Sequence, residues 1–245
     1  QYGNHSDWVR AAAFRPDGLV LATGGDDRRV RFWDFPEGQS PVVLPGVLVG
    51  IRAMAFSPAS EQLAVVGFEP QVHIYEGESG RVERELVAPG GDLRTVAFSP
   101  NGAQLAAGGR EGTVRLWRTA DGTVLHDLSA GSHRVSALQY SDDGTSLAVG
   151  SDDCKVRLWN PETGSLVTEL AAQPGRVMAL CFCGPDRLAV GRSTNDIELW
   201  DLGSHQIVLR LTGHTGSVAA LAFASQDGVL VSGGFDCTIR LWDVQ

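Results

Sequence analysis

Lysine is almost absent from this chain, and other features that would indicate particular functions are missing as well. Lys155 is the single lysine beside nineteen arginines, and the formal net charge is −9. A surface that is basic throughout is excluded, which argues against sequence-independent nucleic-acid binding. No run approaches the roughly 20 apolar residues that a membrane-spanning helix needs, and the start has no basic and apolar signal-peptide pattern.

The four cysteines form no recognisable metal site. Cys154, Cys181, Cys183 and Cys237 include no CxxC pair, and no histidine pair stands at zinc-ligand spacing. We therefore expect no metal, no cofactor and reduced thiols, as in a cytoplasmic protein. Because the chain begins at Gln1 rather than at a methionine, we expect it to be an excerpt of a longer protein.

One aromatic residue recurs at nearly constant spacing. The steps are 42, 42, 42, 41 and 42 residues between Trp33, Tyr75, Trp117, Trp159, Trp200 and Trp242. A period in the forties with four short strands per unit is typical of β-propeller blades. We therefore predict an all-β propeller of six four-stranded antiparallel blades.

Each repeat has the same predicted order of strands and turns. Its first strand alternates around apolar residues, over 9–14, 51–56, 93–98, 135–140, 177–182 and 218–223. A turn with Gly, Asn or Asp follows, because these residues tolerate positive φ. Two further apolar strands and a more variable outer strand complete the repeat. The fifth repeat is one residue short, and we expect its turn at 192–196 to be tighter.

We assign the whole chain, 1–245, to a single domain. The repeats run approximately over 4–44, 45–87, 88–129, 130–171, 172–211 and 212–245. The last repeat ends directly after its third strand. Its blade therefore either has three strands or takes its outer strand from outside this segment, and the number of blades in the parent protein stays open.

The dipeptides Trp33-Asp34, Trp200-Asp201 and Trp242-Asp243, with Gly213-His214, resemble the signature of the WD-repeat family. In that family a His, a Ser or Thr, an Asp and the Trp form a hydrogen-bonded tetrad inside a blade. Carried over by position, the resemblance implies two structural tetrads: His5, Thr23, Asp27 and Trp33 in the first repeat, and His214, Ser232, Asp236 and Trp242 in the sixth.

The four middle repeats depart from the tetrad. Val47, Pro89 and Gly131 stand where the second, third and fourth repeats would have the histidine, and Val149 replaces the Ser or Thr of the fourth. We expect apolar packing rather than a polar network in the four middle blades. A Ser-His-Asp catalytic triad needs an exposed nucleophile on a strained turn, so we predict no catalytic residue.

The resemblance also implies a binding face. Propellers of this family usually bind partners where the loop into the first strand and the loop between the second and third strands emerge. Three positions in each blade face that surface. From them we predict the partner-binding residues Trp8, Arg10, Arg52, Phe68, Arg94, Arg110, Arg134, Arg176, Met178 and Phe235.

Six arginines in this set predict an anionic partner. Every blade but the last would place a guanidinium at the mouth of the channel, which favours an acidic or phosphorylated segment. The aromatic residues and the methionine are types that anchor interfaces. A plainer interpretation is that the arginines pair with Asp26, Asp92 and Asp152, which occupy neighbouring positions.

We therefore expect a non-catalytic scaffold or sensor that binds a protein or peptide, as a monomeric domain within a larger protein or complex. The alternative is binding of phosphoinositide or nucleic acid by the arginines, which the overall acidity disfavours. An enzyme would need clustered carboxylates, histidines or metal ligands at the channel mouth, whereas the predicted set consists of arginines, aromatic residues and one methionine.

Overall fold

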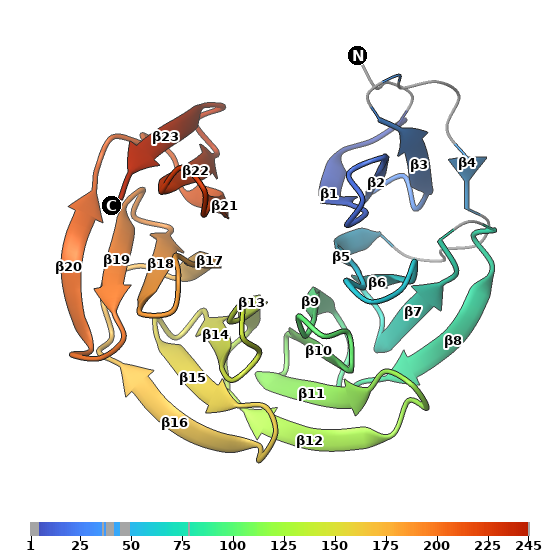
Figure 1. The fold of residues 1–245 in the computed structure, drawn as a ribbon, viewed down its shortest axis with the longest axis horizontal. Coiled ribbons are helices and arrows are strands. Elements are labelled where there is room, and N and C mark those ends of the chain that lie inside the picture. The colour runs from blue at the N-terminus through green and yellow to red at the C-terminus, as the bar shows by residue number, and fades with distance from the viewer. Residues whose placement is uncertain (1–4, 36, 38–41, 45–49, 78, 245) are drawn as a thin grey trace. The chain divides into compact units, whose positions relative to one another are not determined.

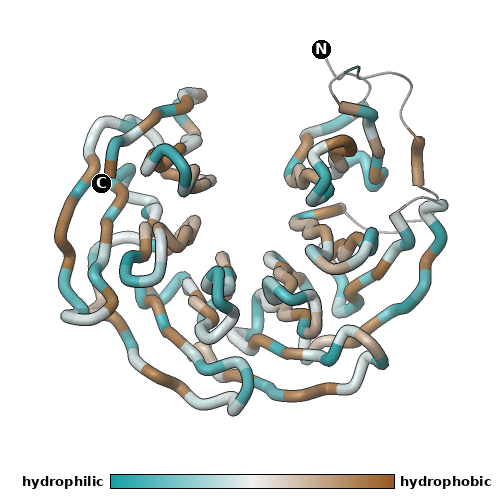
Figure 2. Tube along the Cα trace, in the orientation of Figure 1, coloured by the Kyte–Doolittle hydropathy of each residue, from teal (hydrophilic) through white to brown (hydrophobic). Residues whose placement is uncertain are grey.

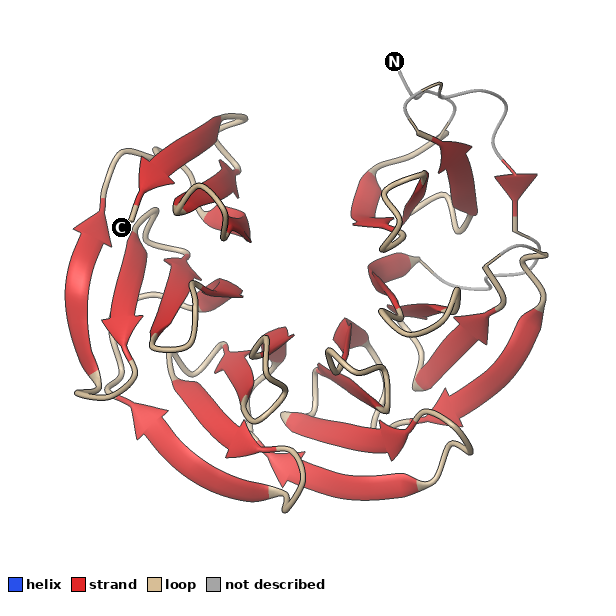
Figure 3. Ribbon diagram, in the orientation of Figure 1, coloured by secondary structure: helices blue, strands red, loops and turns tan. Residues whose placement is uncertain are grey.

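The chain forms six antiparallel sheets (Figure 1). The structure is a computed structural model and describes residues 5–35, 37, 42–44, 50–77 and 79–244. Strands and turns make up this part of the chain, with no helix in it (Figure 3). The predicted fold class is confirmed, since each sheet is a propeller blade with its strands in chain order: the first five blades have four strands, and the described part of the last blade has three.

The chain divides into two compact units, Gln1–Asp127 and Leu128–Gln245. The border between the units lies near the end of the third repeat. The assignment of residues 1–245 to a single domain stays a prediction. Val47 and the repeat limits at residues 4, 45 and 245 lie outside the described residues.

The first unit contains blades 1 to 3. Blade 1 comprises β1 (Val9–Phe14), β2 (Val20–Gly25), β3 (Val30–Asp34) and β4 (Val42–Val43). Blade 2 comprises β5 (Ile51–Phe56), β6 (Leu63–Gly67), β7 (Gln71–Tyr75) and β8 (Val82–Val87). Blade 3 comprises β9 (Leu93–Phe98), β10 (Gln104–Gly109), β11 (Thr113–Arg118) and β12 (Val124–Ser129), whose last residues cross the border between the units.

The second unit contains blades 4 to 6. Blade 4 comprises β13 (Val135–Tyr140), β14 (Leu147–Ser151), β15 (Val156–Asn160) and β16 (Ser165–Leu170). Blade 5 comprises β17 (Val177–Phe182), β18 (Arg187–Arg192), β19 (Ile197–Asp201) and β20 (Gln206–Leu211). Blade 6 comprises β21 (Val218–Ala224), β22 (Val229–Gly234) and β23 (Ile239–Asp243).

The deletion in the fifth repeat does not lie at 192–196, so that prediction was wrong. The backbone N–H of Arg192 donates to the carbonyl of Asp196, with the same spacing as Ser151 to Lys155 in blade 4. The shortened turn is instead the first hairpin, where Cys183 N–H donates to the carbonyl of Arg187. Only the cross-strand hydrogen bonds locate the deletion, because the sequences of both turns are rich in polar residues and glycine and do not distinguish them.

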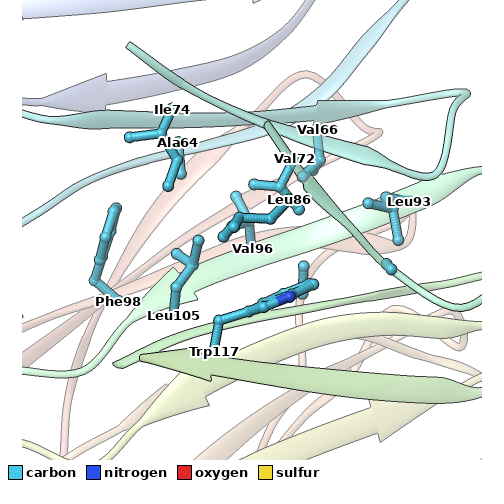
Figure 4. Packing of buried hydrophobic residues seen from close by; sticks show 12 residues of the cluster. Ala64, Val66, Val72, Ile74, Leu86, Leu93, Val96, Phe98, Leu105 and Trp117 are labelled. Carbon is cyan, nitrogen blue, oxygen red and sulfur yellow. The ribbon is translucent and has the colours of Figure 1, made fainter. Parts of the chain in front are cut away.

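Neighbouring blades within each unit pack through the same joint. In Figure 4, Ala64 and Ile74 of blade 2 lie opposite Phe98 and Leu105 of blade 3. The middle and third strands of one blade present small and apolar side chains, and the first strand of the next blade covers them. Hydrophobic and hydrophilic residues follow one another along the strands (Figure 2). The inner strands of a blade are buried on both faces between neighbouring blades, whereas the outer strand meets water.

Candidate binding site

The predicted binding positions lie together at one edge of each blade, which we call the upper edge. The residue before the first strand accepts a hydrogen bond from the residue after the second strand. Examples are Asp26 N–H to the Trp8 carbonyl at 2.9 Å and Asp152 N–H to the Arg134 carbonyl at 2.8 Å. The same bond joins Ser193 to Arg176, so Ser193 is the upper-edge residue of blade 5 that the sequence had left unassigned.

In the first unit, Asp26 connects the upper edges of blades 1 and 2. Its Oδ2 accepts hydrogen bonds from Nη2 and Nε of Arg10 at 2.6 and 2.9 Å. Nη1 of Arg52 lies 3.3 Å from its Oδ1. The hydrogen bond from Arg10, together with the charges of Arg52 and Arg10, lowers the pKa of Asp26 despite its partial burial. This carboxylate therefore stays ionised between two guanidinium groups.

Two arginines of neighbouring blades stack on one aromatic ring. The guanidinium carbon of Arg52 lies 4.0 Å from the ring centroid of Phe68, and that of Arg94 lies 5.1 Å from it. Gly50 makes room for this ring, since a Cβ there would come within 3.2 Å of it. Phe68 remains 45% exposed, so the stack also offers an apolar contact surface.

Trp8 forms a second stack of the same kind. The guanidinium carbon of Arg10 lies 4.5 Å from the Trp8 ring centroid, and the tryptophan is 68% exposed. A guanidinium that stacks on a ring is held in a fixed plane while its N–H groups stay free to donate sideways.

The plainer interpretation of the arginines accounts for part of the set. Arg94 pairs with Asp92, with 2.7 Å between Nε and Oδ1 and a hydrogen bond of 2.9 Å from Nη2 to Oδ2. Arg110, by contrast, is exposed and has no ion pair within the described part of the chain. The buried Nε of Arg52 also lacks a hydrogen-bond acceptor there. The upper edge of the first unit therefore keeps unused donors.

The second unit repeats this arrangement more loosely. Asp152 lies between Arg134 and Arg176, with N–O separations of 3.9 and 4.0 Å. Met178 is half-buried, whereas Phe235 of blade 6 is 67% exposed. No cation–π stack is found here among the described residues, unlike in the first unit.

Both predicted tetrads are hydrogen-bonded inside their blades. Nδ1 and Nε2 of His5 lie 2.9 Å from Asp27 and 2.8 Å from Thr23 Oγ1, which accepts from the Trp33 indole at 2.7 Å. Arg31 also reaches Asp27, at 2.8 Å. In blade 6 the same roles are taken, at 2.7–3.1 Å, by His214, Ser232, Asp236 and Trp242.

Blade 5 corrects the expectation of apolar packing in the middle blades. Glu198, 1% exposed, accepts from Arg192 at 2.8 Å, from the Trp200 indole at 3.1 Å and from Arg210 at 2.9 Å. Arg192 further donates to the carbonyls of Cys154 and Gly175. A sequence signal existed, because a glutamate stands here where four other repeats have arginine.

The described residues of the upper edges form no cluster of metal-ligand side chains. No group of three or more His, Cys, Asp or Glu side chains in the described segments is placed to hold a metal ion. The same segments contain no helix long and apolar enough to cross a membrane.

Comparison with known families agrees with this geometry. The family model described as WD domain, G-beta repeat matches residues 1–34, 80–118, 122–160 and 205–243, which together exceed half of the chain. Matches that begin before β8, β12 and β20 join the outer strand of one blade to three strands of the next. A search of curated proteins gives no match. The chain therefore belongs to the WD40 repeat family.

Proposed function

We propose that this chain is a non-catalytic scaffold or sensor domain of the cytoplasm, and that it binds a protein or peptide at the upper edge of its first unit. WD40 propellers are generally protein-interaction scaffolds, which supports the proposal. Its four cysteines are free thiols, as expected in a reducing compartment.

The observation that carries the proposal is the stack of Arg52 and Arg94 on Phe68. A ring with fixed guanidinium groups combines an apolar anchor with oriented donors, and Arg and aromatic residues dominate interface energetics. Stacking already orders the arginine side chains in the free protein. Less conformational entropy is therefore lost when a partner binds, which favours binding.

An acidic or phosphorylated segment fits this surface best. Four upper-edge arginines of the first unit, Arg10, Arg52, Arg94 and Arg110, stand beside two upper-edge carboxylates, Asp26 and Asp92. A phosphate or carboxylate would accept from the donors that these two aspartates leave unused. Asp26 and Asp92 would meanwhile restrict where on the edge the anion can sit.

The test compares matched peptides that differ at one position, with serine, glutamate or phosphoserine in a sequence selected by peptide display on the 245-residue chain. Fluorescence anisotropy gives the dissociation constant of each. We expect Arg52→Gln with Arg94→Gln to weaken binding of the charged peptides by about tenfold or more. Arg118→Gln is the control, because Arg118 pairs with Asp121 in a turn away from this edge.

Equal binding by the wild type and the double variant would refute the proposed site. Circular dichroism of each variant separates a loss of binding from a loss of fold. Affinity that falls steeply with salt for oligonucleotides or phosphoinositide vesicles, with no peptide selected, would favour the alternative of nucleic-acid or phosphoinositide binding.

A further inference from the structure

The first hairpins of blades 5 and 6 enclose a pocket at the edge opposite the upper edge, which we call the lower edge. Its lining includes, from blade 5 and then from blade 6, Cys183, Asp186, Arg187, Phe223, Gln226 and Val244. The volume is about 300 Å³, at the lower end of the roughly 300–1,000 Å³ of small-molecule sites. Both blades belong to the second unit, so the pocket lies within one compact part of the chain.

The one-residue deletion in the fifth repeat accounts for this pocket. In blade 2 the N–H of Ser57 donates to the carbonyl five residues on, whereas in blade 5 the N–H of Cys183 donates to the carbonyl four residues on. The longer hairpin of blade 2 meets the hairpin of blade 3, since a Cβ on Gly102 would lie 2.5 Å from the Cβ of Ala59. The hairpin of blade 5 has one residue fewer at the same joint, and the pocket lies where the two hairpins would otherwise meet.

A cysteine borders the pocket where other blades have a serine. Blades 2, 3 and 4 carry at this position Ser57, Ser99 and Ser141. Their hydroxyls bond within their own hairpins, as Ser99 Oγ does when it donates to Asn101 Oδ1 at 2.7 Å. Sγ of Cys183 lies instead 3.6 Å from the carbonyl of Cys181 on its own strand. The sulfur is therefore not held by its turn, and it lies at the wall of the pocket.

Two neighbouring groups favour the thiolate form of Cys183. A hydrogen bond from the buried Cys181 thiol lowers the pKa of Cys183, and the charge of Arg187 acts in the same direction, although burial opposes both. The same hydrogen bond and its own burial raise the pKa of Cys181, so Cys181 keeps its proton. Arg187 is fixed at the pocket because its Nη1 donates to the carbonyl of Val244 at 2.7 Å. A cysteine beside an arginine and a thiol donor is the reactive kind.

We propose that Cys183 is a modification site for small amino-acid disulfides, which enter the pocket and exchange with its thiol. The Cys183 thiolate attacks one sulfur of the disulfide, so that a new S–S bond forms to Cys183 and the old S–S bond breaks. Cys183 is oxidised, the released half is reduced, and that thiolate takes a proton from water. Arg187 pairs with the carboxylate of the incoming molecule and Asp186 with its ammonium group. The site does not depend on the upper edge.

The experiment treats the 245-residue chain with cystine and follows each cysteine by mass spectrometry of proteolytic peptides. Cys237 is the internal reference, because its side chain is exposed. We expect Cys183 to form the mixed disulfide about threefold faster or more, although it is only 8% exposed, because a lower thiol pKa raises the thiolate fraction more than it lowers nucleophilicity. Cys183→Ser should abolish the fast reaction and keep the fold, since serine occupies this position in three other blades.

Two matched disulfides test the recognition of the charged groups. Cystamine lacks the carboxylates of cystine, and 3,3′-dithiodipropionate lacks its ammonium groups. For each compound the rate at Cys183 is divided by the rate at Cys237, which removes differences in intrinsic reactivity. Arg187→Gln should reduce the preference for cystine over cystamine by about threefold, and Asp186→Asn should do the same for cystine over dithiodipropionate. Melting temperatures of both variants separate lost recognition from lost fold.

Three results would overturn the proposal. One is a Cys183 that reacts with cystine only after denaturant is added, since the pocket would then give no access to the sulfur. Another is a faster reaction at Cys237 than at Cys183 in the folded chain. The third is a pair of rate preferences that neither Arg187→Gln nor Asp186→Asn changes, because the two charges would then not select the disulfide.

Discussion

In blades 1 and 6 the third-strand tryptophan donates its hydrogen bond to a second-strand side chain. Trp33 donates to Thr23 at 2.7 Å, and Trp242 donates to Ser232 at 2.8 Å. In blade 4 this position is Val149, which pairs with Arg157 as Thr23 pairs with Arg31. The Trp159 indole N–H is buried there without a partner among the described residues.

Val149→Thr should restore this bond. The substitution keeps the side-chain shape and gives the Trp159 N–H an acceptor, so the free energy of unfolding should rise by about 1 kcal/mol in urea titrations. Val190→Thr is the matched control in blade 5, where Trp200 already donates to Glu198. Equal effects of the two substitutions would contradict the explanation.

At the scale of elements, blade 5 is held by a buried ion pair where blades 1 and 6 have a tetrad. Arg192 and Glu198 are both 1% exposed and come from adjacent strands. The carbonyl of Cys154 also accepts from Arg192, so the pair ties the turn of blade 4 to blade 5. A network of this kind is satisfied as a whole and costly when one member is removed.

Glu198→Leu should therefore be strongly destabilising. It leaves Arg192 buried without its carboxylate, with an expected loss of about 3–5 kcal/mol of unfolding free energy. Glu169→Leu is the comparison, because Glu169 pairs with Lys155 and Arg157 but is one-third exposed. Its loss should stay within about 1 kcal/mol. Denaturant titration followed by hydrogen exchange in blade 5 measures both, and similar losses would count against the buried pair.

At the scale of the whole molecule, several aspartate side chains have a pKa below the ordinary value. Arginine and histidine hydrogen bonds lower the pKa of Asp27 although burial alone would raise it, and hydrogen bonds likewise lower the pKa of Asp236. Backbone and side-chain hydrogen bonds from Thr123, aided by Arg118, hold the pKa of Asp121 at about 2. The folded chain therefore binds fewer protons in acid than the unfolded chain does.

This difference predicts acid sensitivity. Since the folded pKa values lie below the ordinary 3.8, their stabilisation is complete above about pH 5 and is lost as pH falls toward about 2. Urea titrations over this range should show a steady fall in unfolding free energy. Asp121→Asn removes one such group from an exposed turn and should flatten the curve, whereas an unchanged slope would contradict its assigned pKa.

The sequence by itself determined the blades, because the aromatic period, the alternation of each strand and the turn residues are local properties. Those signals predicted every first strand within one residue of its observed end, and the resemblance to the WD-repeat family implied the members of both tetrads. The sequence could not locate the deletion in the fifth repeat, since the turns at 183–187 and 192–196 are both polar and only their cross-strand hydrogen bonds distinguish them.

Tertiary structure alone decided which charges meet. Asp26 lies between Arg10 and Arg52, which are 42 residues apart in the chain, and Phe68 is stacked by arginines of two blades. Pairing across blades depends on how their edges approach, which no local pattern encodes. The physical reason is the same for Glu198: its charge is tolerated only because three donors from separate strands converge on one carboxylate.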